Sequence, residues 1–282
     1  MADAYDLILK GATVVNQDGT GVRDIAVSNG RVAAISTAAE PVTGSAPDVI
    51  DCNGLHILPG VIDSQVHFRE PGLTHKEDLE TGSRAAVAGG VTVVFEMPNT
   101  NPLTTTPEAL ADKVAAARGR MFCEFAFYVG ATRENIEDIP ALERLEASAG
   151  MKVFMGSSTG NLLVDDEGSL DRIIARLSRR AAFHSEDEER LIAREGVRRP
   201  GDPTSHPEWR DMEAAMISTR RLVALAEKHR RRVHVLHIST GDEMAFLKDH
   251  REWASVEVTP NHLTLTAPEC YERLGTFAQM NP

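Results

Sequence analysis

From residue 56 onward, short apolar runs alternate with longer amphipathic stretches. This alternation predicts a parallel sheet, because each helix returns the chain to the same edge of the sheet. Seven runs favour a (β/α)8 TIM-like barrel over an open sheet, and a full barrel needs an eighth strand, so we expect an α/β barrel that is incomplete at its C-terminal end. The expected strands are residues 56–67, 91–97, 123–129, 151–155, 181–185, 233–238 and 256–259, and the expected helices are 77–88, 107–118, 139–148, 170–179, 208–229 and 243–249.

Residues 1–55 have a different hydrophobic pattern, with short β-branched or apolar runs at 5–9, 13–16, 23–28 and 31–36. The pairs Asp18-Gly19 and Asn29-Gly30 between these runs are typical of hairpin turns. Residues 40–47 are rich in Pro, Ser and Gly, which is typical of a loop. These features predict a small N-terminal β-sandwich unit over residues 1–55, followed by the barrel over residues 56–282.

The composition excludes several classes of protein. The 282 residues carry a net charge of −12, whereas nucleic-acid or anionic-membrane binding calls for a basic face. No apolar run approaches the roughly 18–20 residues of a membrane span, and the N-terminus does not resemble a signal peptide. The three cysteines are an odd number without CxxC spacing, which disfavours disulfides and a Cys-based zinc site. We therefore expect a cytoplasmic protein that acts on a small molecule.

The end of the first barrel strand carries a row of polar residues. Side chains alternate along a strand, so Asp63, Gln65, His67 and Arg69 share one face. A row of polar side chains on one face of an apolar strand indicates a site inside the barrel. The alternative is a strand end that is simply solvated.

Three further residues have the character of metal ligands. Lys152 lies inside the apolar run of the fourth strand, where a charge is costly unless it is paired, modified, or directed out to solvent. His184 and His237 end the fifth and sixth strands. A single histidine in such a place is more often a packed core residue, but together with His67 and Lys152 the pair predicts a metal site. His234 would face the other way, so we interpret it as a packing residue.

Polar residues at the remaining strand ends allow two interpretations each. Asn99 precedes a Pro-rich turn and serves either that turn or a substrate. Asn261 and His262 form a polar pair after the seventh strand. The acidic residues 186–189 read as a solvated helix start.

Six segments together resemble the dihydroorotases, a branch of the cyclic amidohydrolase superfamily. HFREPG and MPNTNP are the most specific of the shared motifs, and allantoinases and hydantoinases usually differ at the Arg of HFREPG. The matching segments occur in the family's order: VIDSQVHFREPG (61–72), EMPNTNP (96–102), MKVFMGSS (151–158), FHSEDE (183–188), VHVLHIST (233–240) and VTPNHLTLT (258–266).

The resemblance implies a metal-dependent barrel of the amidohydrolase type and a role for each matched residue. Lys152 corresponds to a lysine that is carboxylated and bridges two zinc ions, and His67, His184 and His237 correspond to metal ligands. Arg69 and Asn99 correspond to groups that hold a substrate carboxylate; Asn281 and the region of His262 correspond to further substrate contacts. The implied reaction is the reversible interconversion of N-carbamoyl-L-aspartate and dihydroorotate in de novo pyrimidine biosynthesis.

The sequence departs from the family pattern at several places. Gln65 stands where the family usually has the first His of His-x-His, and its neutral amide oxygen is a weaker zinc ligand than imidazole. Asn261 stands where a second His is often found. The family's catalytic Asp lies on the eighth strand, which we expect beyond Pro282, so no catalytic proton-transfer residue is identified within these residues.

Three interpretations follow from the resemblance. The first is a zinc-dependent dihydroorotase, with one or two metal ions and a homodimeric assembly as one option. The second is a catalytically impaired homologue that acts as a structural partner of aspartate carbamoyltransferase, which Gln65 favours. The third is another cyclic amidase of the allantoinase or hydantoinase type, which Arg69 disfavours.

Overall fold

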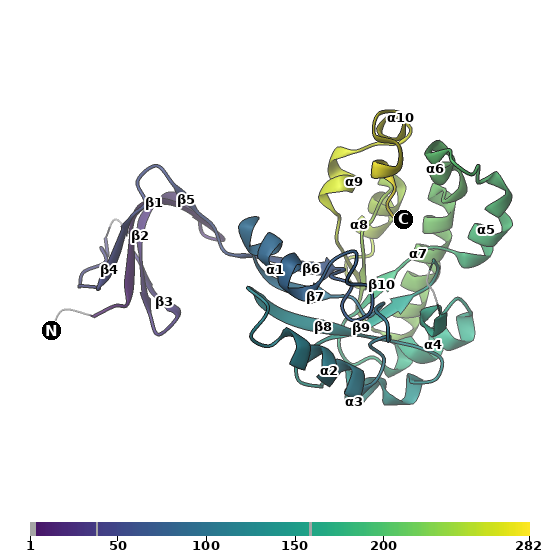
Figure 1. The fold of residues 1–282 in the computed structure, drawn as a ribbon, viewed down its shortest axis with the longest axis horizontal. Helices are drawn as coiled ribbons and strands as arrows, with labels where there is room; N and C mark the ends of the chain where they lie inside the picture. The colour runs from purple at the N-terminus through teal and green to yellow at the C-terminus, as the bar shows by residue number, and fades with distance from the viewer. Residues whose placement is uncertain (1–3, 38, 158–159) are drawn as a thin grey trace. The chain divides into compact units, whose positions relative to one another are not determined.

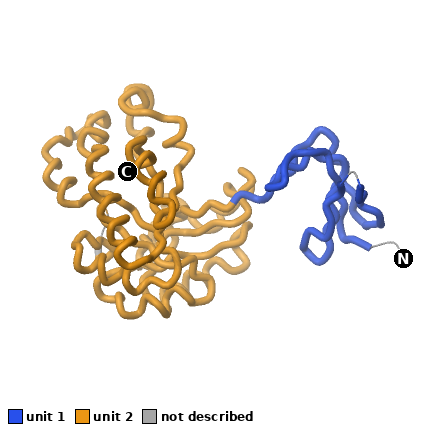
Figure 2. The backbone as a smooth tube through the Cα atoms, turned by 180° about the vertical axis from the view of Figure 1, so that it is seen from behind, with its two compact units in different colours: residues 1–61 blue, residues 62–282 orange. Residues whose placement is uncertain are grey.

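The computed structural model describes residues 4–37, 39–157 and 160–282, so the last residue of the motif at 151–158 lies outside the described residues. The chain divides into two compact units, Met1–Val61 and Ile62–Pro282 (Figure 2). The boundary follows Val61, six residues after residue 55, where the change in hydrophobic pattern had placed it. Every residue expected in the site belongs to the second unit.

The first unit is built on a five-stranded sheet. Its strands are β1 (Leu7–Asn16), β2 (Gly19–Ser28), β3 (Arg31–Ile35), β4 (Asp48–Asp51) and β5 (His56–Ile57), in the order β3-β2-β1-β4 with β5 also paired to β1. The hairpin expected at Asn29-Gly30 is confirmed, because both residues have positive φ angles and join the antiparallel strands β2 and β3. The runs at 5–9 and 13–16 belong to one strand, which is irregular around Gly11 (φ +72°).

The second unit contains a parallel sheet of seven strands among the described residues. They are β6 (Val61–Val66), β7 (Val91–Glu96), β8 (Glu124–Gly130), β9 (Ser148–Phe154), β10 (Ala181–His184), β11 (Val233–Val235) and β12 (Ala254–Val256), and they neighbour one another in sequence order. The sheet curls, since Ser64 on the first strand donates a hydrogen bond of 2.5 Å to Glu257, which follows the last strand. This incomplete barrel confirms the fold class predicted from the alternation of strands and helices.

Helices connect successive strands and pack against them. They are α1 (Leu79–Ala88), α2 (Pro107–Ala117), α3 (Ile139–Leu142), α4 (Glu167–Arg176), α7 (Met212–His229) and α8 (Gly241–Lys248), and Figure 1 shows α2, α3 and α4 following one another along the same side of the sheet. Most begin at a capping side chain that accepts a backbone N–H of the first turn, as the sequence chemistry favours. These caps are Asp78, Thr106, Asp166, Asp211 and Thr240.

Two longer connections carry the remaining short helices. Between β10 and α7 lie α5 (Glu188–Ala193), η3 (Glu195–Val197), η4 (Pro203–Ser205) and α6 (His206–Trp209); after β12 come α9 (Pro260–Thr264), α10 (Glu269–Leu274) and η5 (Gly275–Ala278). The two connections touch, because His206 Nδ1 lies 2.7 Å from the Tyr271 hydroxyl. Both reach the carboxyl ends of the strands, where barrels of this kind build their sites.

Several predicted boundaries were wrong for local reasons. The helix expected at 139–148 ends at Leu142, and Ala147, with a left-handed φ of +62°, leads directly into β9. The strand expected at 256–259 ends at Val256, because Thr259 instead caps α9 by accepting the backbone N–H of His262. The strand expected at 56–67 is two short strands separated by residues 58–60.

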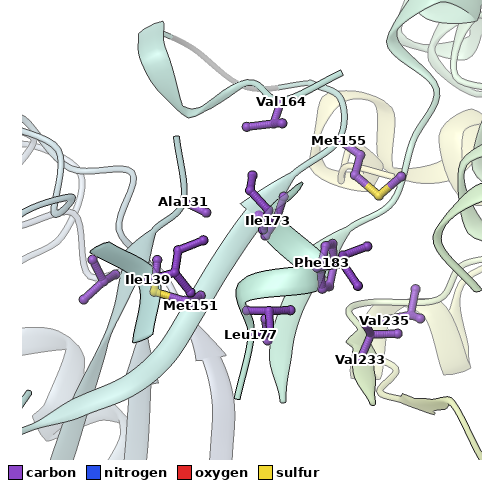
Figure 3. Packing of buried hydrophobic residues seen from close by; sticks show 14 of the residues in the cluster. Ala131, Ile139, Met151, Met155, Val164, Ile173, Leu177, Phe183, Val233 and Val235 are labelled. Carbon is purple, nitrogen blue, oxygen red and sulfur yellow. The ribbon is translucent and has the colours of Figure 1, made fainter. Parts of the chain in front are cut away.

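The largest core cluster of the second unit fills the space between the sheet and its helices (Figure 3). Strand residues such as Met151, Phe183 and Val233 pack against helix residues such as Ile139 and Ile173, and all five are inaccessible to solvent. Each fully buried side chain of this size contributes about 1.5–3 kcal/mol relative to exposure. This apolar layer anchors the strands whose carboxyl ends carry the polar residues.

Replacing Phe183 by Ala should lower the free energy of unfolding by about 3–5 kcal/mol, because the side chain is fully buried and the surrounding core cannot close the cavity completely. Urea denaturation followed by circular dichroism measures this change. Phe277→Ala is the control, since Phe277 is 88% exposed and its removal should change stability by less than about 0.5 kcal/mol. Equal losses in both variants would contradict this view of the core.

Candidate functional site

A cavity of about 1310 Å³ opens at the carboxyl ends of the barrel strands. Its lining includes most of the residues singled out from the sequence, which come from five strands or the loops that follow them: Gln65, His67, Arg69, Asn99, Lys152, His184 and His237. The other walls come from the two long connections, including Arg198, Trp209 and Asn281. The parallel sheet thus brings residues separated by more than a hundred positions into one hollow.

His184 and His237 face each other at the bottom of this cavity. His184 Nδ1 lies 3.0 Å from His237 Nε2, and both side chains are buried. Burial lowers the pKa of each imidazole well below its usual value, and the charge of Lys152 lowers both further. Both rings are therefore neutral near pH 7, which is the form that binds metal ions.

The buried carboxylate of Glu186 orients His184. Its Oε2 lies 2.6 Å from His184 Nε2, and Arg210 forms an ion pair with the same oxygen. A carboxylate paired with Arg only accepts, so His184 Nε2 carries the proton and Nδ1 presents its lone pair toward His237. A histidine held by a carboxylate in this way is typical of metal centres.

The prediction that a helix starts at residues 186–189 is confirmed, because Asp187 caps α5 by accepting the backbone N–H of Arg190. The predicted solvation was wrong for the first two residues, since Glu186 is 1% exposed and Asp187 7%. Arg210, which neutralises Glu186, lies 24 residues further on in a connection without regular periodicity. The signal that could have identified Glu186 was its position two residues after His184 at the end of a strand, rather than its place in an acidic run.

Lys152 is almost fully buried on β9, beside the histidine pair. Its Nζ donates a hydrogen bond of 3.2 Å to the Val153 carbonyl and lies 3.9 Å from the centre of the Phe154 ring. Burial lowers the pKa of this amine well below its usual value, with Glu257 acting in the opposite direction. The alternative of a stem that reaches outward to solvent is excluded by its 1% exposure.

Gln65 and His67, from β6 and the residue after it, also line the cavity. The pKa of His67 is lowered to about 3, first by burial and then by the charges of Arg69 and Lys152, while a hydrogen bond with Asn99 acts in the opposite direction. Gln65 Oε1 is buried without a hydrogen-bond partner. An unsatisfied amide oxygen in such a place is costly, which is typical of a group that a ligand satisfies.

Arg69 and Asn99 lie on neighbouring loops that are tied together. The Asn101 N–H donates to the Pro71 carbonyl at 3.0 Å, and the Met97 N–H donates to the Val66 carbonyl at 3.0 Å. Burial lowers the pKa of Arg69, and the charge of Glu96 raises it. The guanidinium is charged in water at all ordinary pH values and its fork geometry suits a carboxylate.

Other sequence candidates lie at the margin. Asn281 is exposed; its Oδ1 lies 3.0 Å from His206 Nε2. His262 is outside the cavity lining, yet its charge lowers the pKa of His237, and its Nδ1 lies 3.0 Å from the Thr259 hydroxyl. His234, expected to pack on the other face, lies 3.1 Å from the carboxylate of Glu257.

The side chains at the bottom of the cavity fit a metal ion when Lys152 is counted among the ligands. Among the described residues, no three His, Cys, Asp or Glu side chains form a ready metal cluster. The two imidazoles nevertheless converge, with their facing nitrogens 3.0 Å apart, and Gln65 Oε1 in the lining of the same cavity is buried without a hydrogen-bond partner. An anionic form of Lys152 would supply the third donor, and neutral imidazoles with one anionic ligand suit zinc.

The described helices include none that is long and apolar enough to cross a membrane.

Comparisons with known proteins find dihydroorotases, an allantoinase and a hydantoinase that are similar to this chain. The "Dihydro-orotase-like" family model matches residues 54–158. A dihydroorotase of Methanosarcina acetivorans is 32% identical over 98% of this chain and 61% of the relative, and an allantoinase of Salmonella paratyphi B is 30% identical over 99% of this chain and 64% of the relative. The L-hydantoinase of Arthrobacter aurescens superposes with a TM-score of 0.91 at 28% identity, covering 99% of this chain and 63% of that one. The chain thus spans a little under two thirds of the length of these proteins.

The metal-free protein should lose stability on acidification through His67. The pKa of His67 is about 3 in the folded state and about 6.5 in an unfolded chain. Between these values the unfolded chain holds a proton that the folded protein lacks, so the free energy of unfolding falls as the pH decreases from 6.5 toward 3 and is independent of this group above 6.5. His67→Asn should reduce that slope by about 1.4 kcal/mol per pH unit. Urea denaturation at several pH values from 5 to 7 tests this, and equal slopes in both proteins would refute it.

Proposed function

We propose that the chain belongs to the dihydroorotase-like cyclic amidohydrolases and that the protein opens and closes a cyclic amide whose ring carries a carboxylate, as dihydroorotase does. The observation that carries this proposal is the cavity whose lining combines neutral metal-binding groups with a guanidinium. The corresponding reaction is the interconversion of N-carbamoyl-L-aspartate and dihydroorotate in pyrimidine biosynthesis.

In this proposal His184, His237 and a carboxylated Lys152 would hold a zinc ion, with His67 and Gln65 as further ligands. A zinc ion there would supply Lewis acidity that favours the attack of water on an amide carbonyl. Glu186 orients the ring of His184, and its contact with Arg210 opposes the rise that burial causes in the pKa of Glu186. Because Gln65 offers a neutral oxygen in place of an imidazole, the site would hold either one metal ion or two.

The burial of Lys152 supports its carboxylation. An amine attacks carbon dioxide only in its neutral form, and the lowered pKa of Lys152 supplies that form. The amine nitrogen bonds to the carbon of carbon dioxide and releases one proton to solvent, which leaves a carbamate with one negative charge. That charge would then balance the cation in a cavity floor where an uncompensated ion is costly.

Arg69 and Asn99 are proposed to hold the substrate carboxylate. A guanidinium forms two parallel hydrogen bonds to a carboxylate, and such charge-assisted pairs are about twice as strong as neutral ones. Asn99 is already linked to His67, so the substrate-binding and metal-binding sides meet at this hydrogen bond. Asn281 and His262 are proposed as further contacts from the C-terminal connection.

A cyclic amidase with another substrate is the second candidate, because an allantoinase and a hydantoinase are also similar to this chain. Arg69 favours a ring with a carboxylate over an uncharged ring. A structural role beside aspartate carbamoyltransferase rests on Gln65 alone. The convergence of Lys152, His184 and His237 favours the enzyme.

Substrate turnover separates these functions. We expect the zinc-loaded full-length protein to hydrolyse dihydroorotate in preference to allantoin and hydantoin, measured by absorbance and by product chromatography. Arg69→Gln should lower kcat/KM for dihydroorotate by about 100-fold, because it removes charge-assisted hydrogen bonds to the carboxylate. Arg69→Lys is the matched variant, which keeps the positive charge but loses the planar guanidinium that forms two parallel hydrogen bonds. Preference for allantoin or hydantoin, or no turnover of any ring, would reject the dihydroorotase assignment.

Lys152→Ala should lose most of the bound zinc as well as turnover, since the variant lacks the anionic ligand. Metal content after dialysis, measured by mass spectrometry, tests the ligand role independently of activity. The control is Lys228→Ala, because Lys228 has a side chain that is 60% exposed. Partial recovery by short carboxylic acids would agree with a carbamate, whereas full zinc content in Lys152→Ala would contradict the proposed centre.

A further inference from the structure

A chain of hydrogen bonds joins the two long connections at the wall of the cavity. Its centre is His206, the first residue of α6, whose two ring nitrogens both have partners on the connection that follows β12. His206 Nδ1 lies 2.7 Å from the Tyr271 hydroxyl, and His206 Nε2 lies 3.0 Å from Asn281 Oδ1. His206 and Asn281 both line the cavity, and Tyr271, which is buried, lies outside that lining.

The atoms in this chain determine the direction of each hydrogen bond. The amide oxygen of Asn281 can only accept, so His206 Nε2 carries the proton. Burial lowers the pKa of His206, so the ring is neutral near pH 7 and has a single N–H. His206 Nδ1 therefore accepts, and the Tyr271 hydroxyl donates to it. The hydroxyl of Tyr271 thus selects the tautomer of His206 that donates to Asn281.

The imidazole of His206 is held in place by contacts other than the one with Asn281. Its ring packs on the ring of Tyr271, with centroids 5.8 Å apart, and against the ring of Trp209, with centroids 6.4 Å apart. The backbone carbonyl of His206 accepts the Arg210 N–H at 2.9 Å. The donor that meets Asn281 therefore has a position that does not depend on Asn281.

The side chain of Asn281, by contrast, is exposed and takes its orientation from His206. The amide oxygen accepts from His206 at 3.0 Å, and the amide nitrogen lies 3.5 Å from the hydroxyl of Ser157, which also lines the cavity. An amide nitrogen carries two N–H donors, and the long contact with Ser157 uses at most one of them. Because the oxygen is occupied by His206, the nitrogen is the end of the amide that a ligand in the cavity can meet.

A pair of N–H donors suits an oxygen acceptor on the substrate. The carboxylate and the ring carbonyl groups of dihydroorotate offer such oxygens, whereas a ring N–H would need an acceptor at this place. The two ends of an amide have nearly the same shape, so an Asn281 without the His206 contact can turn over and present its oxygen instead. The contact with His206 therefore decides whether Asn281 attracts or repels an acceptor on the substrate.

We propose that His206 is a positioning residue that orients the Asn281 amide so that its nitrogen donates a hydrogen bond to an oxygen of the substrate. This inference rests on the proposed function and deepens it by naming the residue that sets the hydrogen-bonding polarity of one wall of the site. His206 acts through Asn281, and Tyr271 acts through His206. The proposed metal ligands take no part in this chain of hydrogen bonds, so zinc binding should not depend on it.

Two substitutions of His206 separate the roles of its ring nitrogens. The amide nitrogen of glutamine reaches as far as Nε2 and that of asparagine only as far as Nδ1, so His206→Gln keeps a donor toward Asn281 and His206→Asn does not. In the full-length zinc-loaded protein, His206→Asn should raise KM for dihydroorotate at least about fivefold, the effect of one lost hydrogen bond, with kcat within about twofold and zinc content unchanged. His206→Gln should return KM to within about twofold of the wild-type value. Equal KM values in the two variants would overturn the proposal.

A double-mutant cycle tests whether His206 acts through Asn281. Asn281→Ala should itself raise KM, and adding His206→Asn should then change KM by less than about twofold, because no amide remains to be oriented. Effects that multiply would mean that His206 meets the substrate directly or only supports the fold, and would overturn the proposal. His229→Asn is the matched control, since His229 is also half-buried and hydrogen-bonded, to Asp171, but lies outside the cavity lining. Its KM should stay within about twofold of the wild-type value, and a rise equal to that of His206→Asn would contradict the proposal.

Tyr271→Phe guards against a failure of the His206 variants to fold, since it removes a single hydroxyl group. Without this donor the Nδ1-protonated tautomer of His206 becomes available, and KM should rise at least about twofold. Nitrogen NMR of labelled histidine rings should show His206 protonated at Nε2 in the wild-type protein and a larger share of the Nδ1-protonated form in Tyr271→Phe. A wild-type KM in Tyr271→Phe, or a wild-type His206 protonated at Nδ1, would overturn the proposal.

The wild-type protein separates this inference from the proposed function. If the wild-type protein turns over dihydroorotate and His206→Asn has the same KM, the inference alone fails. If the zinc-loaded wild-type protein does not turn over dihydroorotate, the proposed function fails, and the substrate contact assigned to Asn281 fails with it.

Discussion

Desolvation of basic groups at the cavity floor is the constraint on which the rest of the site depends. Lys152, His184 and His237 are buried together, and burial lowers the pKa of each group and so favours its uncharged form. A neutral amine and two neutral imidazoles are suited to react with carbon dioxide or to bind a cation, whereas the protonated forms are not. The apolar core beneath these three residues supplies the low-polarity surroundings. It also stabilises the fold against the free-energy cost of burying basic groups.

Around that floor, buried carboxylates are placed where direction matters. Glu186 orients the ring of His184 and forms an ion pair with Arg210, while Glu96, the last residue of β7, forms a buried ion pair with Lys113. Each carboxylate is thus paired with a cation from another element, which limits the cost of burial. The parallel sheet makes this arrangement available, since successive strands deliver their last residues to the same edge.

The sequence allowed the prediction of those features that depend on local pattern. Alternation predicted the sheet, and polar residues at strand ends predicted that Lys152 and His184 would meet in one cavity. What could not be predicted depends on distant partners. The burial of Glu186 follows from Arg210, which lies in a connection without helical or strand periodicity. The helix expected at 139–148 ends at Leu142, and the chain enters β9 through a left-handed Ala147, a conformation that its residue type does not favour.

The polar groups of the cavity differ in how far the protein itself satisfies them. Gln65 Oε1, in the cavity lining, is buried and has no hydrogen-bond partner. His67, by contrast, is already hydrogen-bonded to Asn99. Groups without partners are the ones that gain most from a ligand, because burial has already removed their water. The substitution of Gln for His at position 65 therefore weakens a donor without removing the need for a ligand there, which is why the change alone does not argue for an inactive site.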